Sequence, residues 1–169
     1  MKTFVITVSR NFPATHKRKG EPTYFSEKIA CTLGDEDTVV KFIEEFGCIL
    51  NKIHTIRDNY PFWEKRIKQV QECKAILSVR YWSGKPYNSK QIEICQLEKD
   101  DGVGIQKLRF LKSYINAPVT DFAENGLTGI DVLTLCKNDG LSIDDFKEWF
   151  KKYDLSEPMA IIHFTKFRY

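Results

Sequence analysis

The apolar residues of the chain follow two spacings, one typical of β-strands and one typical of helices. Stretches rich in β-branched and aromatic residues, most of them bordered by turn-forming residues, have the character of strands. They lie near residues 3–8, 74–82, 90–98, 103–112 and 159–167. We expect these strands to form one curved sheet or barrel.

Helical spacing occurs between these stretches. Phe42, Phe46 and Leu50 share one face of a helix that follows the acidic stretch GDED, whose carboxylates favour a helix N-terminus. Helical spacing or capping residues also mark the segments 61–70, 128–137 and 142–153. Residues suited to begin or end these helices are Asn59, Gly140 and Ser142. The order of strand, helices, several strands, two helices and strand predicts an α+β fold with a mainly antiparallel sheet.

The length of 169 residues fits a single core, and no repeat or long linker divides the chain, so we expect one domain over residues 1–169. The five cysteines are odd in number and lack a C-x-x-C pair, which argues against a disulfide framework and a zinc site. We expect buried thiols in a reducing cytoplasm, and neither a metal nor a cofactor. No apolar run approaches the roughly 20 residues that span a bilayer, so no membrane contact is expected.

The stretch NKIHTIRDNY, residues 51–60, concentrates cationic and hydroxyl side chains between two helical segments. Lys52 and Thr55 are three residues apart, and Arg57 alternates with Thr55 in an extended chain. An alcohol is a weak nucleophile unless a base assists it, and a lysine can be that base when burial or a second cation, here Arg57, lowers its pKa. The alternative, which the spacing alone favours, is a solvated basic turn with His54 as a hydrogen-bonded structural residue.

A second cluster, residues 78–91, interleaves aromatic and cationic side chains around turn-forming residues. Its candidate ligand-binding residues are Arg80, Tyr81, Trp82, Lys85, Tyr87, Lys90 and Gln91. Rings stack bases and cations hold phosphates, so this composition suits a nucleotide or a single strand of RNA. The alternative is a rigid hairpin loop whose rings cap the core. The net charge of +3 is too small to indicate binding of duplex DNA, but it permits such a local basic site.

A third cluster, residues 11–25, contains the charge run HKRK. We expect a solvated loop there, with the rim of a nucleic-acid site as the alternative.

The pattern K-x-x-T-x-R in KIHTIR resembles the signature of the ASCH domain, a member of the PUA-like superfamily. Three other segments are similar to the family: THKRKGEPTYFSEKI, LSVRYWSGKPYNSKQ and KNDGLSIDDFKEWF. The resemblance implies a PUA-like β-barrel with flanking helices and a cleft for RNA or nucleotides.

Some bacterial ASCH proteins are amidohydrolases that deacetylate N(4)-acetylcytidine. The resemblance implies Lys52 as proton acceptor, Thr55 as nucleophile and Asp139, in place of the family's late glutamate, as proton donor. Two functions are therefore open. The first is such an amidohydrolase, with Arg57 steadying the oxyanion. The second is a module that binds RNA, a nucleotide or a modified nucleoside without converting it, with Arg57 as a ligand-binding residue that holds the phosphate. A purely structural or protein-interaction domain is a third. We expect residues 52–57 to line a concave surface shared with the loop 81–91, because a single sheet would bring the two segments together.

Overall fold

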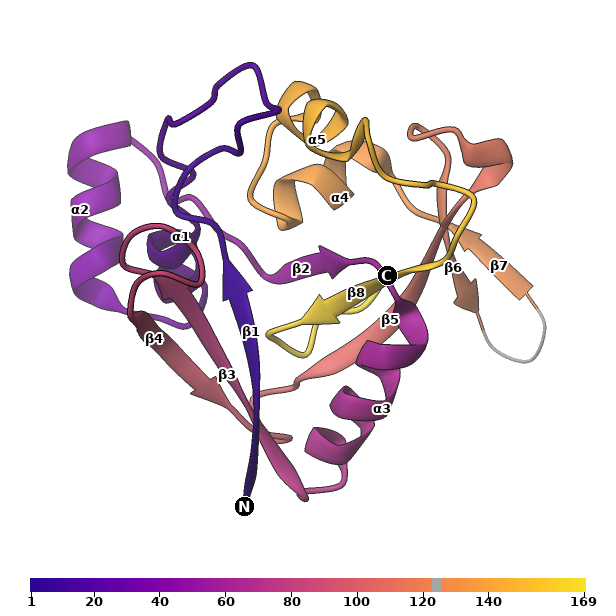
Figure 1. The fold of residues 1–169 in the computed structure, drawn as a ribbon, viewed down its shortest axis with the longest axis horizontal. Coiled ribbons are helices and arrows are strands. Elements are labelled where there is room, and N and C mark those ends of the chain that lie inside the picture. Colours follow the sequence, from indigo (N-terminus) through magenta and orange to yellow (C-terminus); the bar gives the residue numbers. More distant parts are fainter. Residues whose placement is uncertain (123–125) are drawn as a thin grey trace.

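The structure is a computed structural model that describes residues 1–122 and 126–169 (Figure 1). Its strands are β1 (Lys2–Val8), β2 (His54–Arg57), β3 (Ala75–Trp82), β4 (Gln91–Leu97), β5 (Gly104–Phe110), β6 (Pro118–Phe122), β7 (Gly126–Gly129) and β8 (Met159–His163). Its helices are α1 (Phe25–Thr32), α2 (Glu36–Phe46), α3 (Tyr60–Gln71), α4 (Val132–Asn138) and α5 (Ile143–Phe150), with a short 3₁₀ helix at Leu111–Ser113. The protein has an α+β fold with mainly antiparallel sheets, as the sequence predicts.

β1 forms one edge of a three-stranded sheet with the order β1-β3-β4. It runs parallel to β3, whereas β4 runs antiparallel to β3. A parallel neighbour requires a crossover, and α1, α2, β2 and α3 make up this connection. Phe4, Ile6 and Val8 of β1 are buried, so the residues between them face outward.

The second sheet has the order β2-β8-β5-β6-β7, and its described strand pairs are antiparallel. β8 lies between β2 and β5, and all five of its residues are buried. A strand in this position reads as a continuous apolar run, which explains why the sequence marks it clearly.

The five predicted strands correspond to β1, β3, β4, β5 and β8, but the structure divides them between two hydrogen-bonded sheets instead of one. The sequence does not predict β2, β6 or β7, because β2 is short and rich in polar side chains, and the other two contain Pro118, Gly126 and Gly129. The solvated turn that spacing favoured at residues 51–60 is wrong, since the first three residues of β2 are buried.

Helices α2 to α5 lie in the four regions that the sequence predicts, and two predicted N-caps are confirmed. However, α2 ends at Phe46, before Leu50, and residues 128 and 129 belong to β7 instead of a helix. The side chains of Asn59 and Ser142 each accept a hydrogen bond from the N–H group three residues later, at 3.3 and 3.1 Å. Gly140, just after α4, has φ 78° and so ends that helix in the left-handed conformation. The sequence does not predict α1, whose N-cap Tyr24 is left-handed and makes no side-chain cap hydrogen bond.

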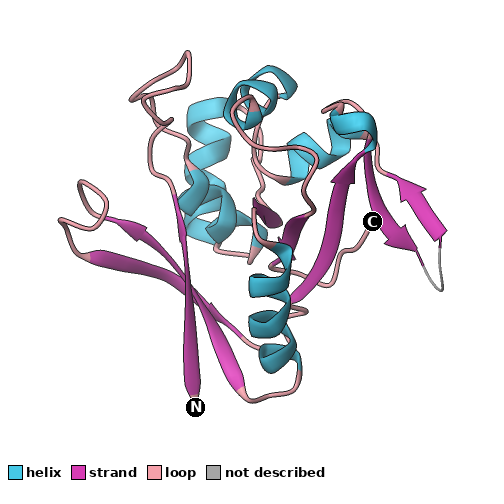
Figure 2. Cartoon of the chain, turned by 45° about the vertical axis from the view of Figure 1, so that its right-hand side comes forward, coloured by secondary structure: helices cyan, strands magenta, loops and turns pink. Residues whose placement is uncertain are grey.

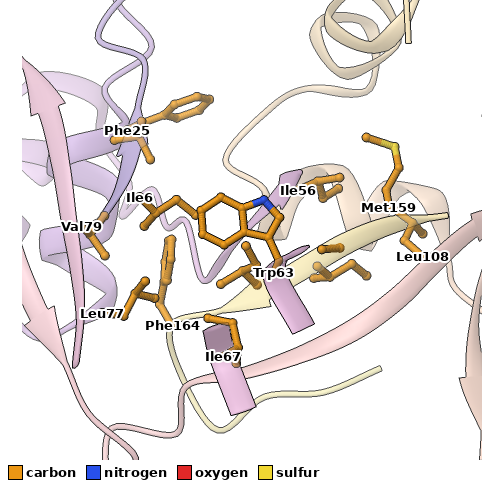
Figure 3. Close-up of a cluster of buried hydrophobic side chains, with 14 of the residues drawn as sticks. Ile6, Phe25, Ile56, Trp63, Ile67, Leu77, Val79, Leu108, Met159 and Phe164 are labelled. Atoms are coloured by element: carbon orange, nitrogen blue, oxygen red, sulfur yellow. The ribbon is translucent and has the colours of Figure 1, made fainter. Parts of the chain in front are cut away.

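One apolar core lies between the two sheets (Figure 3). The indole of Trp63, on α3, lies between Ile6 of β1 and Ile56 of β2. Leu77 of the three-stranded sheet and Leu108 of the five-stranded sheet belong to the same cluster. α3 is therefore the helix that packs both sheets together.

All five cysteines are free thiols. Cys31 and Cys136 are buried and Cys95 is half-buried, but Cys48 and Cys73 are exposed, so the expectation of buried thiols is wrong for these two. Both follow the end of a helix, where the chain turns at the surface. Of the helices in the described ranges, none is long and apolar enough to cross a membrane.

Candidate functional site

Lys52 and Asp139 form a buried ion pair. Only 1% of the Lys52 surface is exposed, and its Nζ donates hydrogen bonds to Oδ1 of Asp139 at 2.8 Å and to the Asp139 backbone oxygen at 2.5 Å. The amide of Lys52 donates to the hydroxyl of Thr32 at 3.0 Å, and Nζ lies 4.2 Å from the centre of the Phe25 ring. The structure thus holds the amine in place from α1 and from the end of α4.

Burial sets the protonation of this pair. It lowers the pKa of Lys52 below its ordinary value although Asp139 opposes the shift, and the nearby Arg57 lowers it further. Burial by itself would raise the pKa of Asp139, but Lys52 and His54 outweigh it and hold that pKa below its usual range. Asp139 is therefore a carboxylate that accepts hydrogen bonds at neutral pH.

A second amine lies beside the pair. Lys28, on α1, donates a hydrogen bond from Nζ to the backbone oxygen of Gly140 at 2.8 Å. Burial, together with the positive charges of Lys52 and Arg18, lowers the pKa of Lys28 to about 8. The sequence analysis did not single out Lys28, because its proximity to Lys52 depends on how α1 packs.

Two histidines and a tyrosine extend the buried network. His54 Nε2 and the hydroxyl of Tyr169 are 2.7 Å apart, and the same hydroxyl accepts a hydrogen bond from Asn138 at 3.0 Å. The other ring nitrogen of His54 lies 3.5 Å from Oδ1 of Asp139. His163 of β8 is completely buried at 5.6 Å from the His54 ring, and neither of its nitrogens has a hydrogen-bond partner among the described residues. One sequence signal for His163 is its place at the end of an apolar strand, MAIIH.

Thr55 is not brought to the amine. It follows His54 in β2, so its side chain points to the opposite face of the strand from the side chain that contacts Asp139. It is 2% exposed, and no partner for its hydroxyl is found in the part of the chain that the structure describes. Of the three residues implied as catalytic, the structure joins Lys52 with Asp139 and directs Thr55 elsewhere.

Arg57 joins the two sheets. Its guanidinium donates hydrogen bonds to the backbone oxygen of Thr7 in β1 and, at 3.0 Å, to that of Ile56. Burial lowers the pKa of Arg57. The guanidinium is thus engaged with backbone carbonyls rather than turned toward solvent.

The second cluster forms one wall of a hollow of about 770 Å³, at the end of the three-stranded sheet. Residues 82–87 line one side, and residues 7–11 with Pro13 line the other. Figure 2 shows the loop between β3 and β4 projecting at this end of the sheet. Trp82, Lys85 and Tyr87 are therefore brought together as predicted ligand-binding residues on one concave surface.

The rings in this hollow are accessible and held in place. Tyr87 is 88% exposed, and its ring centre lies 5.3 Å from that of Trp82 with the planes tilted by 52°. The loop that carries them is tied by Ser89, whose hydroxyl accepts from the amide of Gly84 at 3.0 Å and donates to the backbone oxygen of Lys85 at 2.9 Å. A preformed pair of rings beside a cation, with Tyr87 exposed and Trp82 half-buried, is suited to stacking a planar ligand.

Arg10 completes the hollow, and the sequence analysis missed it. Its guanidinium donates to the backbone oxygen of Ser83 at 3.1 Å and lies 5.5 Å from the centre of the Tyr81 ring. It therefore bridges the two walls. A sequence signal exists, since Arg10 lies two residues after the predicted strand 3–8 and directly before the third cluster.

The other candidates lie outside this lining. Arg80 is paired with Glu93 at 3.2 Å, and Tyr81 is half-buried beneath Arg10. Lys90 and Gln91 stand at the beginning of β4. Their placement fits the structural interpretation of the hairpin better than direct ligand contact.

The third cluster is an exposed loop that is tied to α5 through His16 and Arg18. His16 is buried, with Nε2 at 3.1 Å from the backbone oxygen of Asp145, and Arg18 pairs with the Asp145 carboxylate at 2.8 Å. Asn11 and Pro13, at its start, line the hollow. The expectation of a solvated loop therefore agrees with the exposure of Lys17, Arg18 and Lys19, and it is wrong for His16.

The two main clusters do not share one surface. The lining of the 770 Å³ hollow includes none of Lys52, Thr55, Arg57 and Asp139. Their one described link is Arg57, which binds the backbone of Thr7 behind the wall of the hollow. A common concave surface was expected because one sheet would bring the two segments together, whereas the structure places β2 in one sheet and β3 and β4 in the other.

No group of three or more His, Cys, Asp or Glu side chains within residues 1–122 and 126–169 is placed to hold a metal ion. Comparison of the chain with protein-family models, with curated proteins and with solved structures gives no match. The ASCH resemblance therefore rests on the short motifs of the sequence.

Proposed function

We propose that the chain is an ASCH-type, PUA-like module that binds RNA, a nucleotide or a modified nucleoside in the 770 Å³ hollow. The observation that carries the proposal is the ring pair of the half-buried Trp82 and the exposed Tyr87, in a hollow that two cations, Arg10 and Lys85, also line. A base would stack on the rings, and the cations would hold its phosphate. Stacking contributes about 1–3 kcal/mol per base, so loss of one ring should lower the affinity measurably.

Titration with uridine 5′-monophosphate and with single-stranded RNA, at about 50 and 200 mM salt, tests this proposal. Tyr87→Ala should weaken binding roughly tenfold at both salt concentrations, since a stacking loss of about 1.4 kcal/mol is tenfold. Lys85→Ala should weaken binding mainly at low salt. The matched control is Lys90→Ala, which removes the same charge from the same hairpin outside the hollow. Absence of saturable binding at low salt, or equal losses in Lys85→Ala and Lys90→Ala, would contradict the proposal.

A second candidate is the amidohydrolase, favoured by one observation, the lowered pKa of Lys52 beside Arg57. A base of this kind is what deprotonation of an alcohol needs. Two features oppose it: Asp139 is held ionised and so is a poor proton donor, and Lys52 is almost completely buried. Incubation with N(4)-acetylcytidine would decide, because hydrolysis releases acetate and cytidine. Turnover that disappears in both Lys52→Met and Thr55→Ala would move the assignment to the enzyme.

A further inference from the structure

A second basic hollow, of about 700 Å³, lies between the first half of β1 and the exposed side of α3. Three cationic side chains line it: Lys2 from β1, and Lys65 and Arg66 from α3. The lining identified within the described residues contains no Asp or Glu. Its remaining polar side chains are Thr3, Asn59 and Gln69. The charge of this hollow therefore favours an anionic ligand.

The three cations are available for such a ligand. The guanidinium of Arg66 lies 3.9 Å from the centre of the Phe62 ring, and Nζ of Lys2 lies 4.8 Å from the centre of the Phe4 ring. Within residues 1–122 and 126–169, no carboxylate is found at ion-pair distance from Lys2, Lys65 or Arg66. Lys68, three residues beyond Lys65, differs in this respect because it is paired with Glu64 at 3.0 Å.

The two basic hollows follow one another along β1. Residues 2–5 line the second hollow and residues 7–11 line the first, and Thr3, Val5 and Thr7 lie on the outward face of the strand. Figure 2 shows β1 flanked by the β3–β4 loop and by α3. At about 3.3 Å per residue, β1 from Lys2 to Val8 covers roughly 20 Å. A flexible polyanion that crosses the face of β1 can reach both hollows.

We propose that the second hollow is a subsite for the phosphates of a single-stranded nucleic acid whose base occupies the first hollow. This inference rests on the proposed function and narrows its ligand to an oligonucleotide, with a mononucleotide filling only the first hollow. The subsite holds phosphates through Lys2, Lys65 and Arg66, and it is independent of base identity because its described cations offer charge rather than base-edge readout.

The test compares uridine 5′-monophosphate with oligouridylates of about 4 to 16 nucleotides, the usual range of single-strand site sizes. Lys65→Glu should weaken binding of the longer oligouridylates about tenfold and reduce the dependence of log affinity on log salt by about one, while the monophosphate binds as before. Lys68→Glu is the matched control, with the same charge change on the same helix outside the lining. Tyr87→Ala should weaken both ligands, and circular dichroism should show that the variants are folded.

Each contrary result has a distinct meaning. Oligouridylates that bind no more tightly than the monophosphate would overturn the subsite and leave the proposed function standing, whereas a wild-type protein that binds neither would remove both. Equal losses in Lys65→Glu and Lys68→Glu would show a diffuse charge effect and overturn the subsite. Polyglutamate of the same total charge tests whether the hollow binds acidic peptides instead. If it displaces the oligouridylates with equal affinity, and Lys65→Glu abolishes this competition, the hollow is reassigned to acidic peptides.

Discussion

Among single residues, Lys52 and Asp139 stand out because they form a buried ion pair. Each is buried, and each is the charged partner of the other at 2.8 Å. Removing one charge of a buried pair leaves the other uncompensated, which typically costs about 3–5 kcal/mol. We therefore expect Asp139→Asn to lower the free energy of unfolding by about this amount, measured by urea denaturation at pH 7. The double variant Lys52→Met/Asp139→Asn should recover part of the loss, since it leaves no unpaired buried charge. A double variant less stable than the single one would contradict this account.

At this scale the resemblance predicted one contact that the structure contains. Lys52 and Asp139, far apart in the chain, were linked through the resemblance, and the structure places them in contact. Thr55 could not be placed in the same way, because its orientation depends on the alternation of a strand that spacing did not reveal. Arg10 and Lys28 acquire their importance from neighbours that only the folded chain provides.

At the level of elements, the junction of β2 and β8 makes stability depend on pH. His163, in β8, is buried beside His54 and Arg168, and burial lowers its pKa to about 2. In the unfolded chain the pKa of a histidine is near 6.5. Below that pH the unfolded chain therefore binds a proton at this residue, whereas the folded chain does not. The stabilising effect of the neutral ring is complete above pH 6.5 and is lost as the pH falls toward 2. The expected slope is about 1.4 kcal/mol of unfolding free energy per pH unit for this residue.

His163→Phe removes this titrating group together with its two ring nitrogens, which have no hydrogen-bond partner among the described residues. We expect a flatter pH dependence between about pH 6 and 4, where His54 still contributes in the same direction, and unchanged or higher stability at pH 7. Thermal unfolding followed by circular dichroism across this range provides the measurement. An unaltered slope in the variant would show that the acid sensitivity originates elsewhere.

The sequence predicted the elements with long apolar runs or clear helical spacing and missed those with few apolar residues. β8 and α3 have uninterrupted apolar runs or clear helical spacing, and both were predicted. β2 is recognised as a strand only through its pairing with β8, since its own sequence, HTIR, is mostly polar. Tertiary pairing therefore overrides the local pattern at the segment where the candidate chemistry was expected.

At the scale of the whole molecule, Arg57 links the two sheets through hydrogen bonds to backbone oxygens. The sequence analysis expected it to hold a phosphate, but its guanidinium binds the backbone oxygens of Thr7 and Ile56. Hydrogen bonds from a charged group contribute about 1.5–3 kcal/mol. Arg57→Met should lower the free energy of unfolding by about 1–3 kcal/mol and change the affinity for uridine 5′-monophosphate little. A variant with normal stability and strongly reduced nucleotide affinity would restore the phosphate-binding role.

The division of the strands into two sheets could not be predicted from the spacing of apolar residues. Spacing indicates which face of a strand is buried, but it does not indicate which strands are neighbours. The parallel pairing of β1 with β3 and the insertion of β8 between β2 and β5 both join distant parts of the chain. The fold class followed from the order of elements, whereas the arrangement of the sheets required the structure.

The position of β8 has a consequence for biosynthesis. As the chain leaves the ribosome, β2 and β5 emerge well before residues 159–163, the strand to which both are hydrogen-bonded. Until then each has an open edge that can pair with a neighbouring nascent chain. Completion of the five-stranded sheet must therefore await the synthesis of residues 159–163, and a chain interrupted before them would leave these edges open to aggregation.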